Sequence, residues 1–265
     1  MSVDGAVAVP TVPSVTGELS KRRAVMLLAA STSDMCGRYT LTVSTEVVER
    51  RFDARAVEPI EPTYNAAPRE SLPVIRADAP ETISPMTWGF TPAWADDRRD
   101  LINARSETVS EKRSFREAYR ERPCLVLADG FYEWVEEGGE KRPYRVARRD
   151  GEPFAMAGLW EAWTPPTRQT GLDAFSGEGS TGDTEPTEAF TILTTEPNEV
   201  VRPLHHRMAV VLPEDREREW LTADPGERHG LLRPVSGEAF RAYPVSTAVN
   251  DPSVDRPDLI EEVGA

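Results

Sequence analysis

The stretch "CLVLADGFYEWV", residues 124–135, carries a clear strand signal. Leucine, valine and aromatic side chains dominate it, which predicts a buried β-strand. In its second half, "GFYEW" surrounds Glu133 with bulky aromatic side chains. Loss of water around a carboxylate raises its pKa and suits it to proton transfer. The alternative interpretation makes Glu133 the outward-facing residue of an alternating strand.

Similar apolar runs recur along the chain and predict further strands, with turn residues between them. They lie at 72–77, 84–90, 143–148, 154–163, 190–195 and 208–212. Amphipathic spacing predicts helices over 45–52, 114–122 and 214–224. Many short strands with few helices predict an α+β protein whose core is a curved antiparallel sheet or barrel, with short helices at its periphery.

The remaining segments are polar and predict flexible additions to one domain. Residues 1–34 are small, polar and interrupted by proline, which predicts a disordered leader. Residues 164–188 hold almost nothing to bury and are interpreted as a flexible acidic insertion between two strands. Residues 251–265 are expected to form a loosely attached acidic tail. A single domain is therefore predicted over 35–250.

The composition is strongly acidic, with 45 Asp and Glu against 31 Lys and Arg and a net charge of −14. Only three of the basic residues are lysine. Abundant carboxylate with little lysine is typical of proteins from a salt-adapted cytoplasm. Two cysteines, Cys36 and Cys124, cannot build a disulfide scaffold, and they form no zinc-binding pair. We therefore expect a cytoplasmic protein without a metal or cofactor.

Cys36 directly follows an internal methionine, Met35, and this position allows two interpretations. Cys36 is either a small buried residue or, if Met35 is the true start, the amino terminus of the working protein. The preceding "KRRAVMLLAASTSD" has an apolar run of only seven residues, the lower limit for a signal peptide. Asp34 and Met35 also stand where a lipoprotein signal has small residues. Secretion, lipidation and membrane association are therefore not expected, and no run approaches the ~20 apolar residues of a membrane span.

Polar clusters stand at the ends of apolar runs, where loops carry function. They are "MCGRYT" (35–40), "LINARSET" (101–108), "ADGFYEW" (128–134) and "LHHRMAVVL" (204–212). Each has a structural explanation, such as a turn at Asn103. Adjacent histidines on a strand point to opposite faces, so at most one of His205 and His206 faces a given site. The four clusters together predict an active site that contains Cys36, Asn103, Glu133 and His205.

Two kinds of chemistry would use a cysteine at this position. A thiol-dependent hydrolase of peptides or amides would pair Cys36 with His205. If Met35 is removed, Cys36 instead offers an α-amine and a thiol on one residue. The amine forms an imine with an aldehyde, and the thiolate then closes on the same carbon to give a thiazolidine. The ring-opened deoxyribose of an abasic DNA site is such an aldehyde.

Basic residues cluster between positions 98 and 122 and allow a third interpretation. This window holds eight basic and five acidic residues, which makes it +3 inside a −14 chain. A solvated helical face with mixed charge pairs would explain it. A non-catalytic protein that binds single-stranded DNA would use the same window together with aromatic side chains. Arg38 and Arg105 lie close in sequence to the predicted site residues and could hold flanking phosphates.

Seven motifs, taken in order, resemble the SRAP family, the SOS response-associated peptidases or abasic site processing proteins. The motifs are "MCGRYT", "TYNAAPRESLPV", "MTWGFTPAW", "INARSET", "CLVLADGFYEW", "AGLWEAW" and "FTILTTEPN…LHHRM". The resemblance runs from Met35 to about Leu212 and more loosely to Val245. It departs at Ala209, where the family has proline, and in the 34-residue leader. A mis-called start codon would explain that leader.

The resemblance implies the SRAP fold and a covalent reaction with DNA. Autocatalytic removal of Met35 would expose Cys36, which would link to the abasic aldehyde, and a strand-cleaving lyase activity can accompany the link. Asn103 would position the amine or the opened sugar. Glu133 would be the general acid and base for methionine release and imine formation. His205 would help to open the sugar ring and to reverse the link.

The resemblance also implies a DNA surface and a partner. Arg38 and Arg105 would contact phosphate, while Trp88 and Phe90 would stack on bases or wedge between them. A position in the core is the alternative for Trp88. The expected partner is single-stranded DNA with abasic sites, and the protein is expected to act as a monomer.

Overall fold

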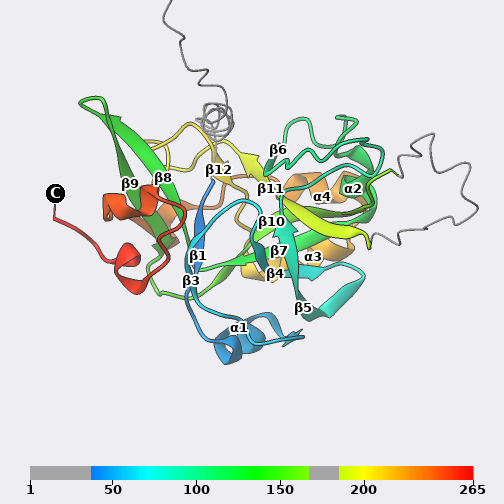
Figure 1. Ribbon diagram of the computed structural model, residues 1–265, viewed down its shortest axis with the longest axis horizontal. Helices are drawn as coiled ribbons and strands as arrows, with labels where there is room; N and C mark the ends of the chain where they lie inside the picture. Colours follow the sequence, from blue (N-terminus) through cyan, green and yellow to red (C-terminus); the bar gives the residue numbers. More distant parts are fainter. Residues whose placement is uncertain (1–36, 167–184, 265) are drawn as a thin grey trace, which may run out of the picture. The chain divides into compact units, whose positions relative to one another are not determined.

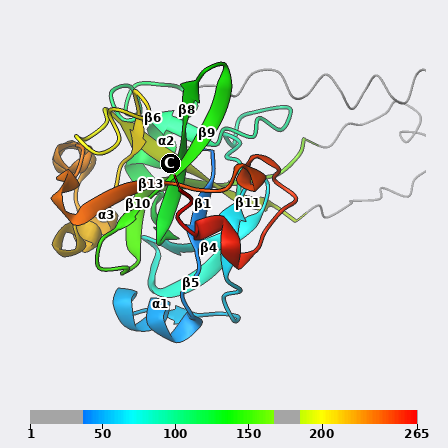
Figure 2. The same ribbon diagram turned by 90° about the vertical axis from the view of Figure 1, so that its left-hand side faces the viewer.

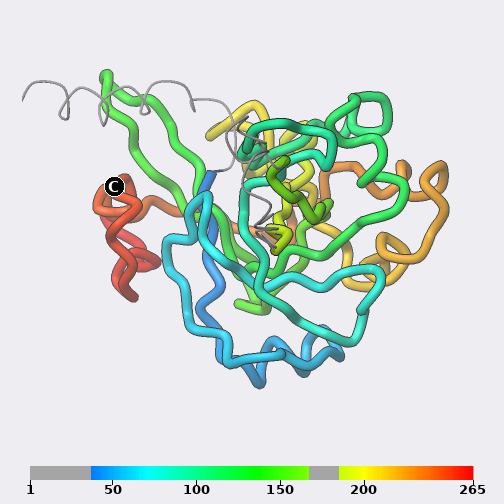
Figure 3. The backbone as a smooth tube through the Cα atoms, turned by 45° about the vertical axis from the view of Figure 1, so that its right-hand side comes forward, coloured from blue at the N-terminus to red at the C-terminus, as the bar shows by residue number. Residues whose placement is uncertain are grey.

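The computed structural model describes residues 37–166 and 185–264 (Figure 1). The predicted leader, Cys36 and the middle of the predicted insertion lie outside the described residues. One antiparallel sheet has the strand order β13 (Phe240–Pro244), β9 (Glu140–Arg148), β8 (Gly130–Glu137), β1 (Tyr39–Leu41) and β3 (Thr63–Ala66). The long β8–β9 hairpin extends away from the other strands, as Figure 3 shows in green.

A second sheet closes on itself. Its order is β12 (Met208–Ala209), β11 (Thr187–Thr195), β10 (Phe154–Trp163), β7 (Pro123–Ala128), β4 (Ser71–Arg76), β5 (Ala79–Trp88) and β2 (Arg55–Ala56). Because β11 also pairs with β5, the strands β11, β10, β7, β4 and β5 form a closed ring. The short strand β6 (Asn103–Arg105) joins the ring through β11.

The predicted fold class, a barrel-like core with short peripheral helices, is confirmed. The sheet is mixed, because β11 runs parallel to β5 and β6, and β2 runs parallel to β5. Long connections make such parallel pairs, and the strand signals in the sequence carry no information about them. The α-helices are α1 (Thr45–Phe52), α2 (Arg116–Glu121), α3 (Glu217–Thr222) and α4 (Pro225–Arg228). Among residues 37–166 and 185–264, no helix is long and apolar enough to span a bilayer.

The described part of the chain also contains short 3₁₀-helices. They are η2 (Glu214–Arg216), η3 (His229–Leu231), η4 (Gly237–Ala239), η5 (Thr247–Asn250) and η6 (Pro257–Ile260). The last two belong to the C-terminal segment, drawn in red beside β1 and the β8–β9 hairpin in Figures 1 and 2.

The stretch 124–135 is two strands, whereas its sequence predicts one. β7 belongs to the closed ring and β8 to the other sheet, and Asp129 stands between them. The Asp129 carboxylate is buried. It accepts hydrogen bonds from both the hydroxyl and the amide of Thr42 at 2.6 Å, and from the hydroxyl of Thr40. The guanidinium of Arg145 on β9 completes the set at 2.9 Å. This corner therefore ties β1, β8 and β9 together.

Glycine is required next to that corner. A Cβ atom at Gly130 would lie only 2.7 Å from Nε of Arg145, whose guanidinium packs directly over the backbone. Arg145 also donates to the hydroxyl of Tyr243 on β13 at 2.8 Å. In the sequence "ADG", Asp129 thus supplies the hydrogen-bond acceptor, and Gly130 leaves room for the guanidinium of Arg145 where the chain passes from one sheet to the other.

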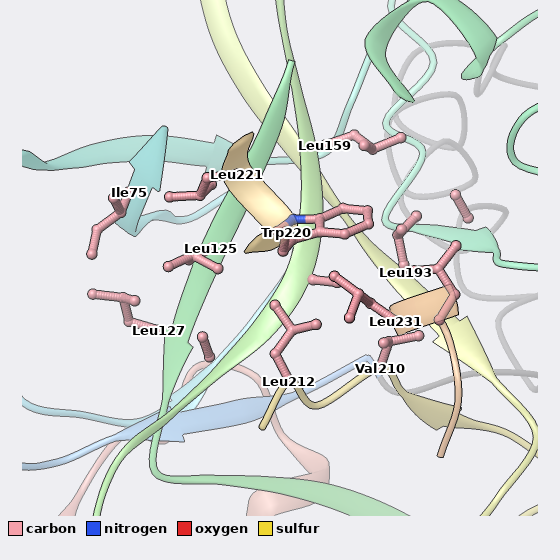
Figure 4. Close-up of a cluster of buried hydrophobic side chains, with 14 of the residues drawn as sticks. Ile75, Leu125, Leu127, Leu159, Leu193, Val210, Leu212, Trp220, Leu221 and Leu231 are labelled. Atoms are coloured by element: carbon pink, nitrogen blue, oxygen red, sulfur yellow. The ribbon is translucent and has the colours of Figure 1, made fainter. Parts of the chain in front are cut away.

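Side chains of the ring strands alternate between two apolar clusters. On β7, Cys124 and Val126 face a cluster that also contains Tyr39 and Phe131 from the other sheet. Leu125 and Leu127 face the opposite cluster, which the helices cover. Figure 4 shows Trp220 of α3 at the centre of that second cluster, among leucines from several strands. Both faces of the ring strands are therefore buried.

The C-terminal segment differs from its prediction. Leu259 is fully buried, in a cluster with Tyr132, Tyr243, Val245 and Val249. The backbone amide of Tyr64 donates to the carboxylate of Asp255 at 2.6 Å. Residues 251–264 are therefore not a loose tail, because a few apolar side chains anchor a segment that is otherwise acidic.

Candidate active site

Glu133 and His205 meet although 72 positions separate them in the sequence. Glu133 lies on β8 and is buried, with 2% of its surface exposed. Nδ1 of His205 lies 3.6 Å from Oε2 of Glu133. This separation is longer than a hydrogen bond and is that of an ion pair when the imidazole is protonated. The pair therefore places an acid–base group beside a buried carboxylate.

The loop between β11 and β12 holds His205 by its own backbone contacts. Nδ1 of His205 lies 3.0 Å from the carbonyl oxygen and 3.2 Å from the amide nitrogen of Arg207. The amide of His205 donates to the carbonyl of Val201 at 2.9 Å. The ring also packs against the exposed His206 in a tilted arrangement, with 4.4 Å between ring centroids and 46° between ring planes. The two histidines lie in a loop and not on a strand, so the prediction that they point to opposite faces does not apply; the contact with Glu133 comes from His205.

Asn198 organises the start of this loop, and sequence reasoning did not identify it. It is buried, and its side-chain oxygen accepts from the amides of Val200 and Val201 at 3.1 and 3.0 Å. Its side-chain nitrogen donates to the carbonyl of Val235 at 3.1 Å. Asparagine directly after a strand is a common turn signal, so "TTEPN" carried the information.

Asn103 and Arg105 lie on the same side of β6, because side chains alternate along a strand. β6 pairs in parallel with β11, and Asn103 is level with Ile192 while Arg105 is level with Thr194. Asn103 is buried and Arg105 is exposed. The indole nitrogen of Trp88 donates to the carbonyl of Ile102 at 2.9 Å, which fixes the start of the strand.

Arg207 binds the residue of β11 that is level with Arg105, Thr194. Its Nη2 donates to the carbonyl of Thr194 at 2.6 Å, and its fork pairs with the carboxylate of Glu107. The hydrogen bond from Arg207 holds the pKa of Glu107 below its usual value. Thr194 therefore stands between the two arginines, and sequence reasoning assigned no role to Arg207.

Strand β1, which begins at Tyr39, pairs with β8, the strand that carries Glu133. Its ladder with β8 pairs Tyr39 with Phe131, and the amide of Tyr132 donates to the carbonyl of Arg38 at 3.0 Å. Continuing this register by two residues brings Gly37 opposite Glu133. Cys36, the next residue, lies outside the described residues.

Arg38 is half-buried and already engaged within the protein. Its Nη1 donates to Oδ1 of Asn65 at 2.9 Å and to the carbonyl of Val249 at 3.0 Å. Burial lowers the pKa of its guanidinium, and the carboxylates of Glu70 and Asp251 oppose that shift. An arginine keeps its charge under such a shift.

The interpretation of Trp88 and Phe90 as stacking residues is wrong for this structure. Both side chains are fully buried. Trp88 packs between Tyr39 and Phe190, with centroid distances of 5.2 and 6.3 Å, and Phe90 packs on Phe115. A base needs an exposed ring face, which neither residue offers.

An exposed indole occurs at Trp94, four residues after Phe90 in the sequence. Its exposed fraction is 42%, and the guanidinium of Arg113 lies 4.0 Å from its ring centroid. Trp94 lies in a charged loop ("TPAWADDRRD"), and that polar setting is the signal that separates it from Trp88. It is the better candidate for contact with a base.

Cys124 is excluded as a nucleophile. It is fully buried on β7, and burial raises the pKa of its thiol. A buried, protonated thiol is inert. Within the described part of the chain, no group of three or more His, Cys, Asp or Glu side chains is arranged to hold a metal ion.

Comparisons with known proteins agree with this architecture. A crystal structure of a Bacteroides thetaiotaomicron protein superimposes with a TM-score of 0.72 at 25% identity, and the match covers 86% of this chain and all of that one. A Bordetella bronchiseptica structure gives a TM-score of 0.65 at 26% identity and covers 80% of this chain. The closed ring with its second sheet is thus an established fold.

The family follows from the sequence match. The family model for SOS response associated peptidase (SRAP) matches residues 35–252. Abasic site processing protein YoqW of Bacillus subtilis is 36% identical over 238 residues, which cover 86% of this chain and 99% of YoqW. Abasic site processing protein YedK of Escherichia coli is 30% identical and covers 86% of this chain and 100% of YedK. The chain belongs to the SRAP family.

Proposed function

We propose that this protein processes abasic sites in single-stranded DNA and that Cys36 forms the covalent link. The α-amine of Cys36 attacks the aldehyde of the opened deoxyribose, and loss of water gives an imine. The thiol then adds across the C=N bond, so that sulfur bonds to carbon and the proton goes to nitrogen. The thiazolidine that results holds the sugar by two bonds, and both must break before release.

One observation carries this proposal: the ladder between β1 and β8 pairs Tyr39 with Phe131, two residues along β8 from Glu133. When this register continues, Gly37 is opposite Glu133, and Cys36 is the residue that precedes Gly37 in the sequence. Relatives named abasic site processing proteins support the choice of substrate. The burial of Cys124 supports Cys36 as the reactive cysteine.

The site residues then take separate roles. Glu133 transfers protons during imine formation, and its buried position supports that role. His205, 3.6 Å away, assists sugar opening and the reversal of the link, from which lyase activity can arise. Asn103 orients the amine or the opened sugar. The exposed Arg105 binds a flanking phosphate, and Arg38 binds another.

The mechanism requires a free α-amine at Cys36. While residue 35 is attached, that nitrogen is an amide and cannot form an imine. We propose that residues 1–34 are absent from the working protein and that Met35 is removed in a hydrolysis for which Glu133 is the base. The domain, which begins at residue 35 and includes the anchored segment 251–264, then acts as a cytoplasmic monomer; the predicted insertion 164–188 is shorter at its end, because Thr187 and Glu188 belong to β11.

Single-stranded DNA crosses a surface that includes the 98–122 window and Trp94. An exposed indole with an arginine over its face suits stacking by a base and attraction of a phosphate. Trp94 takes the role that the sequence suggested for Trp88 and Phe90.

Intact mass and crosslinking test the proposal together. The purified protein is weighed by mass spectrometry, incubated with a single-stranded oligonucleotide that carries one abasic site, and run on a denaturing gel. We expect a chain that starts at Cys36 and a band that survives denaturation. Cys36→Ala should abolish the band, while the matched control Cys124→Ala should keep it. Amide hydrolysis by a chain that still carries residues 1–35 would favour the thiol-dependent hydrolase instead, and full DNA retention by Cys36→Ala would favour non-catalytic binding.

A further inference from the structure

The motif "TYNAAP" around Asn65 has no role in the mechanism above, yet Asn65 is among the most connected side chains near the site. It lies at the third position of β3 and is buried, with 1% of its surface exposed. Its Oδ1 accepts from Arg38 at 2.9 Å. Its Nδ2 faces three carbonyl oxygens of the C-terminal segment, those of Val249 at 3.3 Å, Asp251 at 3.1 Å and Val254 at 2.8 Å.

These contacts need an uncharged amide. Asparagine offers an acceptor and donors on one short, planar group, so it can receive a proton from a guanidinium and donate to carbonyls at the same time. Aspartate has no donor for the carbonyls and would cancel the charge of Arg38. Asn65 therefore fixes the direction of the Arg38 guanidinium and leaves its positive charge available.

The C-terminal segment that shares Arg38 with Asn65 is itself anchored to the active-site strand. The carbonyl of Val249 accepts from Arg38 at 3.0 Å. On β8 the residues on both sides of Glu133 contact this part of the chain. Tyr132 packs in the apolar cluster that contains Val249 and Leu259, and its hydroxyl donates to the carbonyl of Tyr64, next to Asn65 on β3, at 2.7 Å. The indole of Trp134 donates to the side chain of Asn250 at 2.7 Å.

We propose that Asn65 is a positioning residue for the reaction of Cys36, acting through Arg38. The proposal rests on the function proposed above, in which Arg38 binds a phosphate next to the abasic sugar. Arg38 is two residues from Cys36, so the direction of its guanidinium decides where the sugar stands relative to the amine. An arginine that is held before DNA arrives loses less side-chain freedom on binding.

Salt dependence separates positioning from mere structural support. Affinity of the full chain is measured as a function of KCl concentration, with an oligonucleotide that carries a tetrahydrofuran abasic analogue and therefore cannot form an imine. Each phosphate contact on a single strand contributes about 0.7 to the slope of log affinity against log salt. Asn65→Ala should weaken binding by about tenfold, the loss expected for one charged hydrogen bond. It should also reduce the slope by about 0.7.

Arg38→Ala supplies the matched comparison. It should give the same loss and the same slope change, and the double variant should be no worse than either single variant, since both act on one contact. Leu259→Ala serves as the control. It loosens the apolar anchor of the same segment without touching Asn65, so it should lower the thermal midpoint and leave the slope unchanged.

Covalent capture gives the second readout, measured on protein whose first residue is Cys36 with aldehyde-bearing abasic DNA. Asn65→Ala should slow adduct formation at subsaturating DNA about tenfold, in line with its affinity. Two results would overturn the role of Asn65 in a parent protein that still forms the crosslink. One is a slope of log affinity against log salt in Asn65→Ala that equals the slope of the parent, and the other is a loss of affinity in the double variant that equals the sum of the two single losses. A parent that forms no adduct overturns the proposed function and, with it, this inference. Should Asn65→Ala not fold, Asn65→Asp should lower the slope equally by neutralising Arg38, and an unchanged slope in that variant counts against the proposal.

Discussion

Replacing Asp129 by asparagine should destabilise the protein more than any surface charge change. The carboxylate receives hydrogen bonds from the Thr42 amide, from two threonine hydroxyls and from Arg145. An amide cannot accept at both of its ends, so its NH₂ group would face either the backbone amide of Thr42 or the guanidinium. Whichever way it turns, at least one buried donor loses its partner.

The size of the effect follows from burial. The side chains of Asp129 and Arg145 are 4% and 9% exposed, and removal of one partner of such a pair leaves a buried charge uncompensated. Breaking a buried pair costs about 3–5 kcal/mol. Domains are stable by about 5–15 kcal/mol in total, so this single change removes a large part of the free energy of unfolding. At about 2–4 °C per kcal/mol, the thermal midpoint should fall by roughly 6–20 °C.

Urea unfolding of matched variants checks the reasoning. Asp150→Asn is the control, because Asp150 also pairs with an arginine, Arg148 at 2.6 Å, but is half exposed, and such pairs contribute about 0–1 kcal/mol. A second variant, Asp129→Asn with Arg145→Met, removes the unpaired buried charge of Arg145 and should recover part of the lost free energy of unfolding. If Asp129→Asn costs no more than Asp150→Asn, the corner does not tie β1, β8 and β9 together as described. Because the corner also holds β1 against β8, the same variant should slow adduct formation.

Three further outcomes are expected. Glu133→Gln should slow adduct formation by about 10²–10⁴-fold with an unchanged far-UV circular dichroism spectrum. Glu161→Gln, a change at another buried glutamate, should leave the rate of adduct formation unchanged. Equal rates in the two variants would remove Glu133 from the mechanism. Trp94→Ala should weaken binding to single-stranded DNA by about 1–3 kcal/mol in a fluorescence titration, and an unchanged affinity would mean that no base stacks there. NMR titration should find the pKa of Asp150 lowered from 3.8 to about 2 by its hydrogen bond to Arg148, and Arg148→Gln should raise it. Stabilisation by that pair is then complete above about pH 4 and is lost as pH falls through about 2, and a pKa near 3.8 in the parent would contradict the pairing.

Local sequence patterns predicted the strands well where burial is continuous. β10 matches its predicted span, 154–163, because nearly every one of its side chains is buried. The stretch 124–135 was predicted as one strand, since apolar residues stand on both sides of Asp129, and only a partner such as Arg145 shows why the chain turns there. Trp88 was ambiguous for a related reason: both faces of the ring strands are covered, so an aromatic run cannot indicate which side chains reach solvent.

The members of the candidate site were predictable one by one, but their arrangement was not. Glu133 lies on a strand of one sheet and His205 in a loop that joins two strands of the other, and their 3.6 Å contact depends on long-range pairing that no local pattern encodes. Residues that act through others were missed for the same reason. Asn65 and Asn198 resemble ordinary turn asparagines in sequence. Their side chains hold the site through hydrogen bonds to backbone carbonyls of distant segments, and the sequence does not show these partners.

The pairing of charges shows why a net charge of −14 does not argue against the DNA binding proposed above. Acidic side chains of the 98–122 window are engaged by particular arginines: Asp100 contacts Arg98, and Glu117 and Glu121 contact Arg122. Arg105 remains exposed, and Arg113 lies over Trp94. At physiological salt, charges more than about 8 Å away are largely screened, so a bound phosphate responds to these nearby cations and far less to carboxylates elsewhere. Under the proposed function, the local arrangement of charges, and not the net charge, is therefore expected to set the affinity of this surface for a nucleic acid strand.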